Sequence, residues 1–412
     1  MNSEIVPEQA ATADEAETTR REPWFIVICA IIGTAVGAST MAHYGLGVFL
    51  THIAEDFNWT RGGASNAISM YFIGLGLGVP VAGLLVDYIG PRKTALGSAS
   101  LLAAFMALLG MAHHQEMVKV LCFFMGLAGS ATTLLPYTVV IAARFRMRRG
   151  LAIGLAATGP GVGGIILPQI INWTAYNHDW RFGLFVLSAL IVTLALPAAT
   201  IGLRLNGATA QRRWMVARSA DIVPLWRARP FWTLLSTIVV ANLAVGAVIV
   251  HASPILTDHG INPTTIAAII SSLSIANVCG KISSGYLMDR FTAPYVAAGF
   301  FCLIPAGALV IVAADSLALL AVGFFIIGLT LGAEADIVGY IATKYLPSLQ
   351  HGRAIGLIVA AYSLANALGV AALGHSVDLL GSYTPGLLWV AASGPVAAFL
   401  ITRLGKAPTP QG

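Results

Sequence analysis

Long apolar runs separated by short polar segments dominate the chain. A run of about 18 or more apolar residues predicts a transmembrane helix, because about 20 residues rising about 1.5 Å each cross about 30 Å of hydrocarbon. We find twelve such runs and predict an all-α integral membrane protein. The runs lie near 24–50, 64–86, 94–112, 117–142, 150–172, 182–203, 231–256, 265–288, 293–314, 317–342, 353–375 and 384–403.

The polar segments predict how the chain is divided. The longest internal one, 205–229, separates a six-helix half at 23–204 from a second half at 230–404. Residues 1–22 lack the basic segment of a signal peptide, and we expect a disordered cytoplasmic tail there. A second short tail is expected at 405–412. None of these segments is long enough for a separate catalytic domain.

Charge is scarce and unevenly distributed. Only 10% of the 412 residues are charged, against about 25% in soluble globular proteins, which argues against a soluble enzyme or a nucleic-acid binder. Of the 23 Lys and Arg, 19 fall on the side that holds both ends, and only Arg61, Lys119 and Arg181 fall on the other. The positive-inside rule then predicts cytoplasmic termini. The short loops favour a bacterial inner membrane, and we expect a monomer.

The two halves repeat each other at an offset of 202 residues. Gly83–Asp87 corresponds to Gly285–Asp289, and Ala152–Leu155 recurs as Ala354–Leu357. Six spans per half preserve membrane orientation, so the repeat is parallel and its axis lies along the membrane normal. Halves arranged in this way are expected to enclose a central cavity near the midplane.

The segment Gly83–Lys93, with the sequence GLLVDYIGPRK, resembles the signature of the major facilitator superfamily between its second and third spans. Tyr88 and Pro91 stand where that signature has basic residues. The resemblance covers the whole chain in span number, central loop and repeat. It implies two six-helix halves that alternately expose a central site, and therefore secondary active transport.

The same loop and its repeat contain candidate gating residues. Asp87 is expected at a cytoplasmic helix end, where it can accept hydrogen bonds from a neighbouring helix N-terminus and pair with Arg92. Asp289 and Arg290 occupy the second copy. Such contacts would hold the halves together in one state and break in the other. A simple topological anchor is the alternative.

A narrower resemblance concerns the substrate. Gly45–Leu50 and Glu55–Arg61 are similar to the end of the first span in monocarboxylate and oxalate/formate carriers. Those carriers place a cation in span eight, about two turns before the loop aspartate, and here Lys281 has that position. Asn277 replaces the aspartate of animal monocarboxylate carriers, and Lys replaces their Arg. Tyr362 occupies the position of the oxalate carrier's second cation, which favours a monocarboxylate over a dianion.

Three ionisable residues lie well inside predicted spans, where charge is costly and usually functional. Lys281, Glu334 and Asp336 are expected at similar depth. The two acids point about 200° apart on their helix, so we expect one to pair with Lys281 or line the cavity and the other to be buried. A buried carboxylate can be protonated near neutral pH and suits proton coupling. His43 is a further candidate for that role, and a structural ion pair is the alternative reading.

We hypothesise that Lys281 attracts a substrate carboxylate and that polar groups of other spans line the cavity. Each of these groups could instead be a packed, hydrogen-bonded side chain. Asn366 is not included among them. The candidate lining residues are Asn277, Tyr362, His251, Tyr44, Tyr71 and Tyr137.

A rival function is suggested by span five. Gly159–Gly164, with the sequence GPGVGG, resembles the core of a motif in proton-driven drug exporters. Pro160 lacks a backbone N–H and Gly159 permits a bend, so we predict a helix kink there. Export of a drug or metabolite is therefore the alternative function. No metalloprotease or serine-hydrolase motif is present, and we expect neither enzymatic activity, nor a cofactor, nor a metal.

Overall fold

The prediction of twelve spans is confirmed. A computed structural model describes residues 23–145, 148–204, 227–346 and 351–405. Twelve helical segments of 19 to 30 residues are long and apolar enough to cross a membrane, and the described residues contain no strand. The predicted tails and central loop lie almost wholly outside the described residues.

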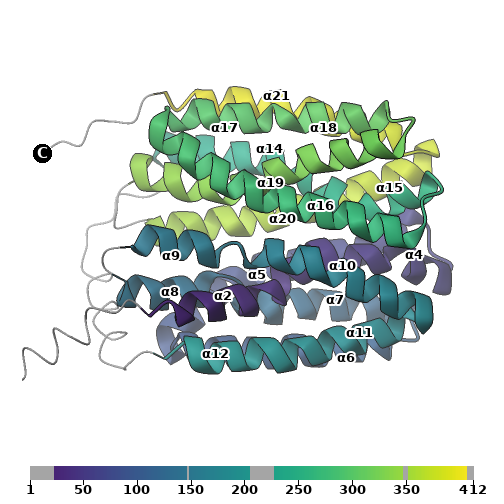
Figure 1. Cartoon of the computed structure of the whole chain (residues 1–412), viewed down its shortest axis with the longest axis horizontal. Coiled ribbons are helices and arrows are strands. Elements are labelled where there is room, and N and C mark those ends of the chain that lie inside the picture. Colours follow the sequence, from purple (N-terminus) through teal and green to yellow (C-terminus); the bar gives the residue numbers. More distant parts are fainter. Residues whose placement is uncertain (1–22, 146–147, 205–226, 347–350, 406–412) are drawn as a thin grey trace, which may run out of the picture.

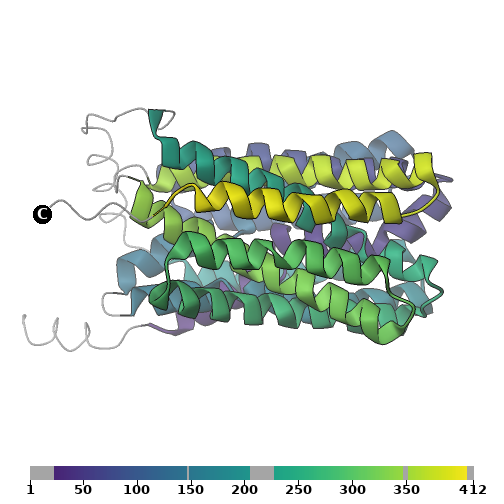
Figure 2. The ribbon, with the colours of Figure 1, turned by 90° about the horizontal axis from the view of Figure 1, so that it is seen from above.

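The helices run side by side along one direction (Figures 1 and 2), and the view of Figure 1 separates them into two groups. The lower group in Figure 1 contains α2 (Phe25–Ala35), α3 (Ala38–Thr40), η1 (Met41–Gly45), α4 (Leu46–Asp56), α5 (Arg61–Ile89), α6 (Pro91–Gly110), α7 (Gln115–Gly129), η2 (Ser130–Thr132), α8 (Leu135–Arg144), α9 (Arg149–Ala156), α10 (Gly159–Asn177), α11 (Trp180–Leu190), η3 (Ile191–Ala195) and α12 (Leu196–Gly202). The upper group contains α14 (Arg229–Val250), α15 (Ala252–Asp258), α16 (Pro263–Arg290), α17 (Ala293–Phe301), α18 (Leu303–Val312), α19 (Leu317–Tyr345), α20 (His351–Leu380) and α21 (Thr384–Thr402).

The repeat extends through the helices of both halves. Helices α5, α6, α7 and α9 begin at residues 61, 91, 115 and 149. Their counterparts α16, α17, α19 and α20 begin at 263, 293, 317 and 351, in each case 202 residues later. The offset found in short sequence matches therefore describes two six-helix pseudo-repeats.

Two spans of the first half are interrupted where they meet. The first span breaks after Ala35 and continues through the π-helix η1. The fifth breaks after Ala156 and resumes at Gly159, directly before Pro160. A Cβ atom on Gly163 would collide with the Ala35 carbonyl oxygen, so only glycine allows this approach. The predicted kink position thus coincides with a break that α2 packs against.

A pair of glycines lets α5 and α7 approach each other closely. A Cβ on Gly74 would collide with the Phe123 carbonyl oxygen, and a Cβ on Gly126 would collide with the Tyr71 carbonyl oxygen. The opposing atoms are backbone, which cannot rotate away. Small residues that permit such close contact are a usual basis of helix association in membranes.

Gly126→Ala should therefore destabilise the first half. Overpacking a tight contact costs about 1–3 kcal/mol, and the midpoint of thermal unfolding in detergent should fall. Gly97→Ala is the matched control, because α6 leaves open space around Gly97. Equal unfolding midpoints for the two variants would contradict this account of the α5–α7 contact.

Candidate substrate site

The centre of the candidate site is an ion pair inside the membrane spans. Lys281 of α16 lies with its Nζ atom 3.8 Å from Oδ1 of Asp336 on α19. Their side chains are 11% and 30% exposed. Each charge compensates the other in a setting where an isolated charge would be costly. The distance exceeds that of a strong hydrogen bond, so the ammonium group retains donors for another oxygen.

Glu334 stands apart from this pair although it is only two residues from Asp336. It is 3% exposed, and neither carboxylate oxygen has a hydrogen-bond partner among the described residues. Lys281 is the charged group that acts on it electrostatically. The two acids thus divide as their helical spacing suggested: Asp336 pairs with Lys281, and Glu334 is buried.

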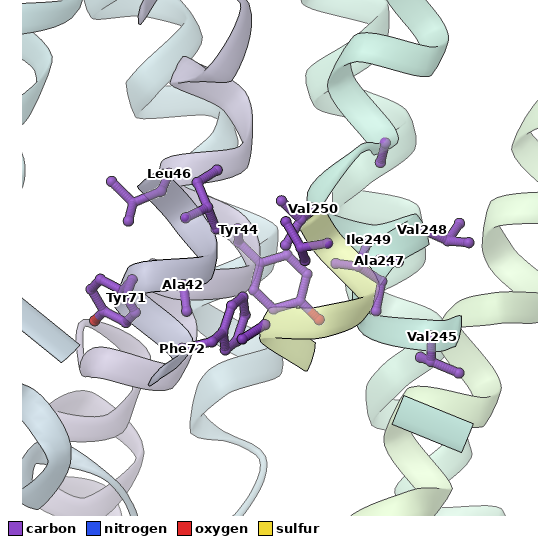
Figure 3. Packing of buried hydrophobic residues seen from close by; sticks show 14 of the residues in the cluster. Ala42, Tyr44, Leu46, Tyr71, Phe72, Val245, Ala247, Val248, Ile249 and Val250 are labelled. Atoms are coloured by element: carbon purple, nitrogen blue, oxygen red, sulfur yellow. The ribbon is translucent and has the colours of Figure 1, made fainter. Parts of the chain in front are cut away.

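The first half contributes Tyr44 to the same region. Tyr44 lies on η1 between Phe72 and Val250, at the boundary of the two halves (Figure 3). Its hydroxyl approaches Asn277 and Ser274 of α16 but makes no well-formed hydrogen bond within the described residues.

Gly164 on α10 makes room for the tyrosine ring. A Cβ at Gly164 would lie 2.9 Å from two ring atoms of Tyr44. The same Cβ would also collide with the hydroxyl of Ser274 on α16. The glycine therefore lets the first, fifth and eighth spans meet at one point.

Helix α20 adds Tyr362 and an amide that the sequence analysis left out. Tyr362 interacts with Asn366 and lies close enough to Glu334 for electrostatic coupling. Asn366 Nδ2 donates to Asn242 Oδ1 at 3.4 Å, and a Cβ on Gly246 would collide with the Asn366 amide. Both asparagines are buried in apolar spans. That property was the sequence signal that could have identified them.

Three of the predicted residues lie outside this cluster. Tyr71 donates its hydroxyl hydrogen to the Ala38 carbonyl at 2.9 Å, within the first half. Tyr137 packs in a separate apolar cluster and covers Gly33. His43 bonds the carbonyl of its own helix at Ser39 (2.9 Å). In the described part of the chain, no hydrogen bond or ion pair joins any of the three to Lys281.

His251 also lies away from Lys281. It is fully buried at the break between α14 and α15 and hydrogen-bonds Ser65, Val370 and Tyr383. Ser65 belongs to the first half and the other partners to the second. The structure therefore places His251 in a contact between the halves and not beside the ion pair.

The four predicted gating residues lie at two corresponding helix ends. Asp87 is in the last turn of α5 and Arg92 in the first turn of α6, and Gly90 makes the turn between them with a φ of 90°. Asp289 and Arg290 end α16, and the Arg290 guanidinium lies 4.3 Å from the centre of the Tyr286 ring. All four side chains are exposed.

The described residues offer no cluster typical of a metal centre. No group of three or more His, Cys, Asp or Glu among them is placed to hold a metal ion. The four cysteines are free, with Cys29 and Cys122 buried and Cys279 and Cys302 exposed.

Comparison with known proteins identifies the family. The model of the Major Facilitator Superfamily matches residues 24–370. The chain belongs to this superfamily, and it is a multi-pass membrane protein whose family carries small molecules.

A curated relative points toward one branch of the family. The chain is 25% identical to monocarboxylate transporter 13 of Rattus norvegicus over 367 residues, which cover 88% of this chain and 84% of that protein. Monocarboxylate transporter 2 of Homo sapiens is 23% identical over 389 residues, covering 87% and 80%.

Among solved structures, the D-xylose-proton symporter superimposes with a TM-score of 0.73 at 13% identity and covers 94% of this chain and 98% of its own. Identity at this level shows a shared fold alone.

Removing the hydroxyl of each of two buried tyrosines in the first half distinguishes a role in stability from a role in transport. Tyr71→Phe removes a bonded hydroxyl and should lower the unfolding midpoint, since loss of a buried hydrogen bond costs about 0.5–1.5 kcal/mol. Tyr44→Phe removes a hydroxyl without a well-formed bond and should leave the midpoint unchanged while reducing transport. Thermal unfolding in detergent and uptake into proteoliposomes measure the two effects. A destabilised Tyr44→Phe with normal uptake would contradict the assignment.

Proposed function

We propose that the chain is a proton-coupled carrier of a small organic anion, a monocarboxylate, that works by alternating access. The observation that carries the proposal is the Lys281–Asp336 pair, a cation held by a carboxylate inside the membrane spans. Tyr44 from the other half approaches Asn277, which lies one helical turn before Lys281 on α16. The monocarboxylate transporters among its relatives support this substrate class.

In this mechanism the substrate carboxylate shares or displaces Asp336 at Lys281. The 3.8 Å separation leaves donors on the Lys281 ammonium, and the partly exposed Asp336 has room to move. When the substrate leaves, Asp336 again neutralises the lysine, so the empty carrier does not hold an isolated charge. Tyr44, Asn277 and Tyr362 would contact the rest of the substrate.

Charge balance supplies the reason for proton coupling. If Glu334 were ionised, the single positive charge of Lys281 would face three negative charges, those of Asp336, Glu334 and the bound carboxylate. Two negative charges would then stay uncompensated in a region of low dielectric. Protonation of Glu334 removes one of them, and its burial favours the neutral acid. Binding of the anion and of a proton therefore assist each other, which is the requirement for symport.

The orientation in the membrane is also part of the proposal. The excess of Lys and Arg on the side of both ends supports cytoplasmic termini. The bacterial inner membrane and the monomeric state rest on sequence arguments alone and stay predictions.

Proton-driven export of a drug or metabolite is the second candidate function. The break before Gly159 and Pro160 is at the position of the exporter-like motif. The same ion pair could then exchange a cargo for protons in the opposite direction. Uptake driven by a pH gradient in right-side-out vesicles favours import, and accumulation only in inverted vesicles favours export.

Lys281→Gln should abolish carboxylate uptake while the protein level in the membrane stays normal, because the group that attracts the anion is gone. Uptake into proteoliposomes from a screen of monocarboxylates is the measurement. Lys119→Gln is the matched control, since Lys119 forms a partly exposed pair with Glu116 one turn away.

Lys281→Gln leaves Asp336 unpaired, so stability needs a separate check. The double variant Lys281→Gln/Asp336→Asn removes both charges of the pair and should be stable but equally inactive. Uptake by either variant at the wild-type rate would refute the substrate role of Lys281.

Glu334→Gln should separate exchange from proton-driven transport. Gln resembles the protonated acid and cannot release a proton, so uptake driven by a pH gradient should be lost while substrate counterflow persists. Glu116→Gln, which changes an exposed acid, should retain both activities. Gradient-driven accumulation by Glu334→Gln at the wild-type level would remove Glu334 from the coupling mechanism.

A further inference from the structure

Hydrogen bonds join the two halves at the end of the bundle where α4 and α15 lie in Figure 1, opposite the start of α2 and the end of α21. The residues of the first half that make this contact lie on α5, beginning with its first turn. Arg61 Nη2 lies 2.9 Å from Asp258 Oδ1 of α15, and the Gly62 backbone N–H donates to Asp378 Oδ2 of α20 at 3.0 Å. The carboxylate of Asp378 thus occupies the N-terminus of α5, a favourable place for a negative charge.

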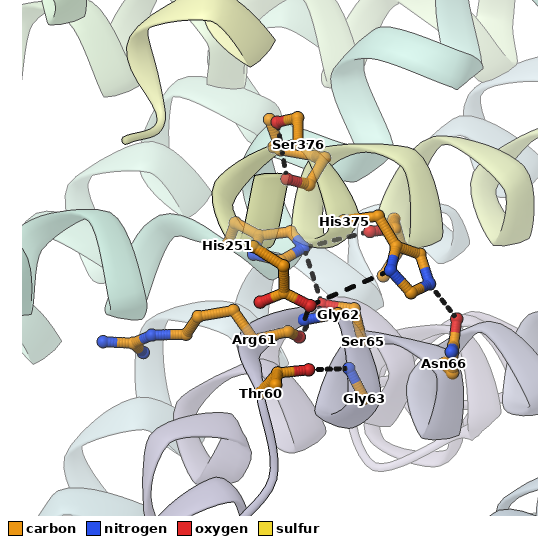
Figure 4. Close-up of polar contacts among 12 residues, drawn as sticks. Thr60, Arg61, Gly62, Gly63, Ser65, Asn66, His251, His375 and Ser376 are labelled. Carbon is orange, nitrogen blue, oxygen red and sulfur yellow. Dashed lines mark hydrogen bonds and ion pairs between the residues drawn. The ribbon is translucent and has the colours of Figure 1, made fainter. Parts of the chain in front are cut away.

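His251 is at the centre of this contact, and its hydrogen bonds define one tautomer (Figure 4). Nε2 lies 3.1 Å from the Val370 carbonyl, which can only accept, so Nε2 carries the hydrogen. Nδ1 is then the acceptor for the Tyr383 hydroxyl at 3.1 Å. Ser65 donates to the Arg61 carbonyl and can accept from Nε2 at 3.2 Å. A neutral His251 therefore satisfies partners from both halves.

The contact continues deeper along the same face of α5. Ser69, one turn beyond Ser65, donates to the Ala367 carbonyl of α20 at 2.7 Å. Gly62 is the small residue that makes room for α20 at this contact, because a Cβ there would collide with the His375 ring and the Asp378 carboxylate.

The outer surface is hollowed above this contact. A cavity of about 530 Å³ is lined by residues that include Trp59, Arg61 and Asp378. Two of these residues hold the halves together, so the cavity ends where the contact begins. Separation of the halves here would extend the cavity inward along α5 and α20.

We propose that His251, Ser65, Tyr383 and Val370, with the Arg61–Asp258 pair, form an outer latch that holds this side of the carrier closed. His251 is its main element, because opening breaks its bond to the first half and exposes a side chain that is fully buried when closed. The latch rests on the proposed alternating access, but not on the identity of the substrate.

A cysteine reporter tests the latch without substrate. Ser274→Cys lies on α16 at a position with no exposure, and Cys279 and Cys302, which are exposed, are replaced by Ala. A membrane-impermeant thiol reagent is added on the side where α4 and α15 lie. Adding His251→Ala should raise the labelling rate about tenfold, as expected when bonds that stabilise only the closed state are lost.

His259→Ala is the matched control, because His259 bonds only the Ile255 carbonyl of its own helix and should leave labelling unchanged. Ser65→Ala and Tyr383→Phe each remove a single partner and should raise labelling several-fold, which also decides the matter if His251→Ala does not fold. In the background of His251→Ala, the further change Ser65→Ala should increase the labelling rate only slightly.

Labelling of all three latch variants at the rate of the unmodified reporter would overturn the latch. The test measures opening and not uptake. An inactive Lys281→Gln with intact latch behaviour, or the reverse, therefore separates failure of the substrate proposal from failure of this one.

Discussion

A charge is costly in a medium of low dielectric, and this cost determines how the ionisable side chains inside the membrane spans are arranged. Lys281 is tolerated within its span because Asp336 stands 3.8 Å away on a neighbouring helix. Tyr44 of the first half approaches α16 at Asn277, one turn from the lysine, so the position of the halves affects the surroundings of the pair. In the proposed mechanism an anion and a proton each change this same local charge balance.

The contact between the halves follows from the same constraint. Near the exposed surface the halves are joined by an ion pair, Arg61–Asp258, whose two side chains are partly exposed to water. Farther in, the contacts are hydroxyl groups, backbone carbonyls and a neutral histidine, as at Ser69 and His251. Groups without net charge can separate and re-form with a smaller desolvation cost than buried ions. For the proposed outer latch, an exposed ion pair and buried neutral groups are therefore the arrangement with the lower cost of opening.

Much of the fold was predictable because membrane spans are encoded locally: run length and loop charge depend on nearby residues. The 202-residue repeat is also visible in the sequence, by direct comparison of its two halves. Depth and helical spacing predicted that one of the two acids pairs with Lys281 or lines the cavity, and the structure pairs Asp336 with it. The direction in which a polar side chain points did not follow. Tyr71 and His251 were candidate cavity-lining groups, and the structure shows both in hydrogen bonds away from the Lys281–Asp336 pair. The partners of His251 are up to 186 residues away in the chain, and no local pattern indicates such contacts.

The most direct test of the central claim is an experimental structure with the best-transported monocarboxylate bound. The account predicts the substrate carboxylate within hydrogen-bonding distance of Lys281 Nζ, either sharing the lysine with Asp336 or displacing Asp336 from it. Tyr44 should contact the rest of the substrate. A substrate bound elsewhere, with the Lys281–Asp336 pair undisturbed, would contradict it and leave the pair as a purely structural element.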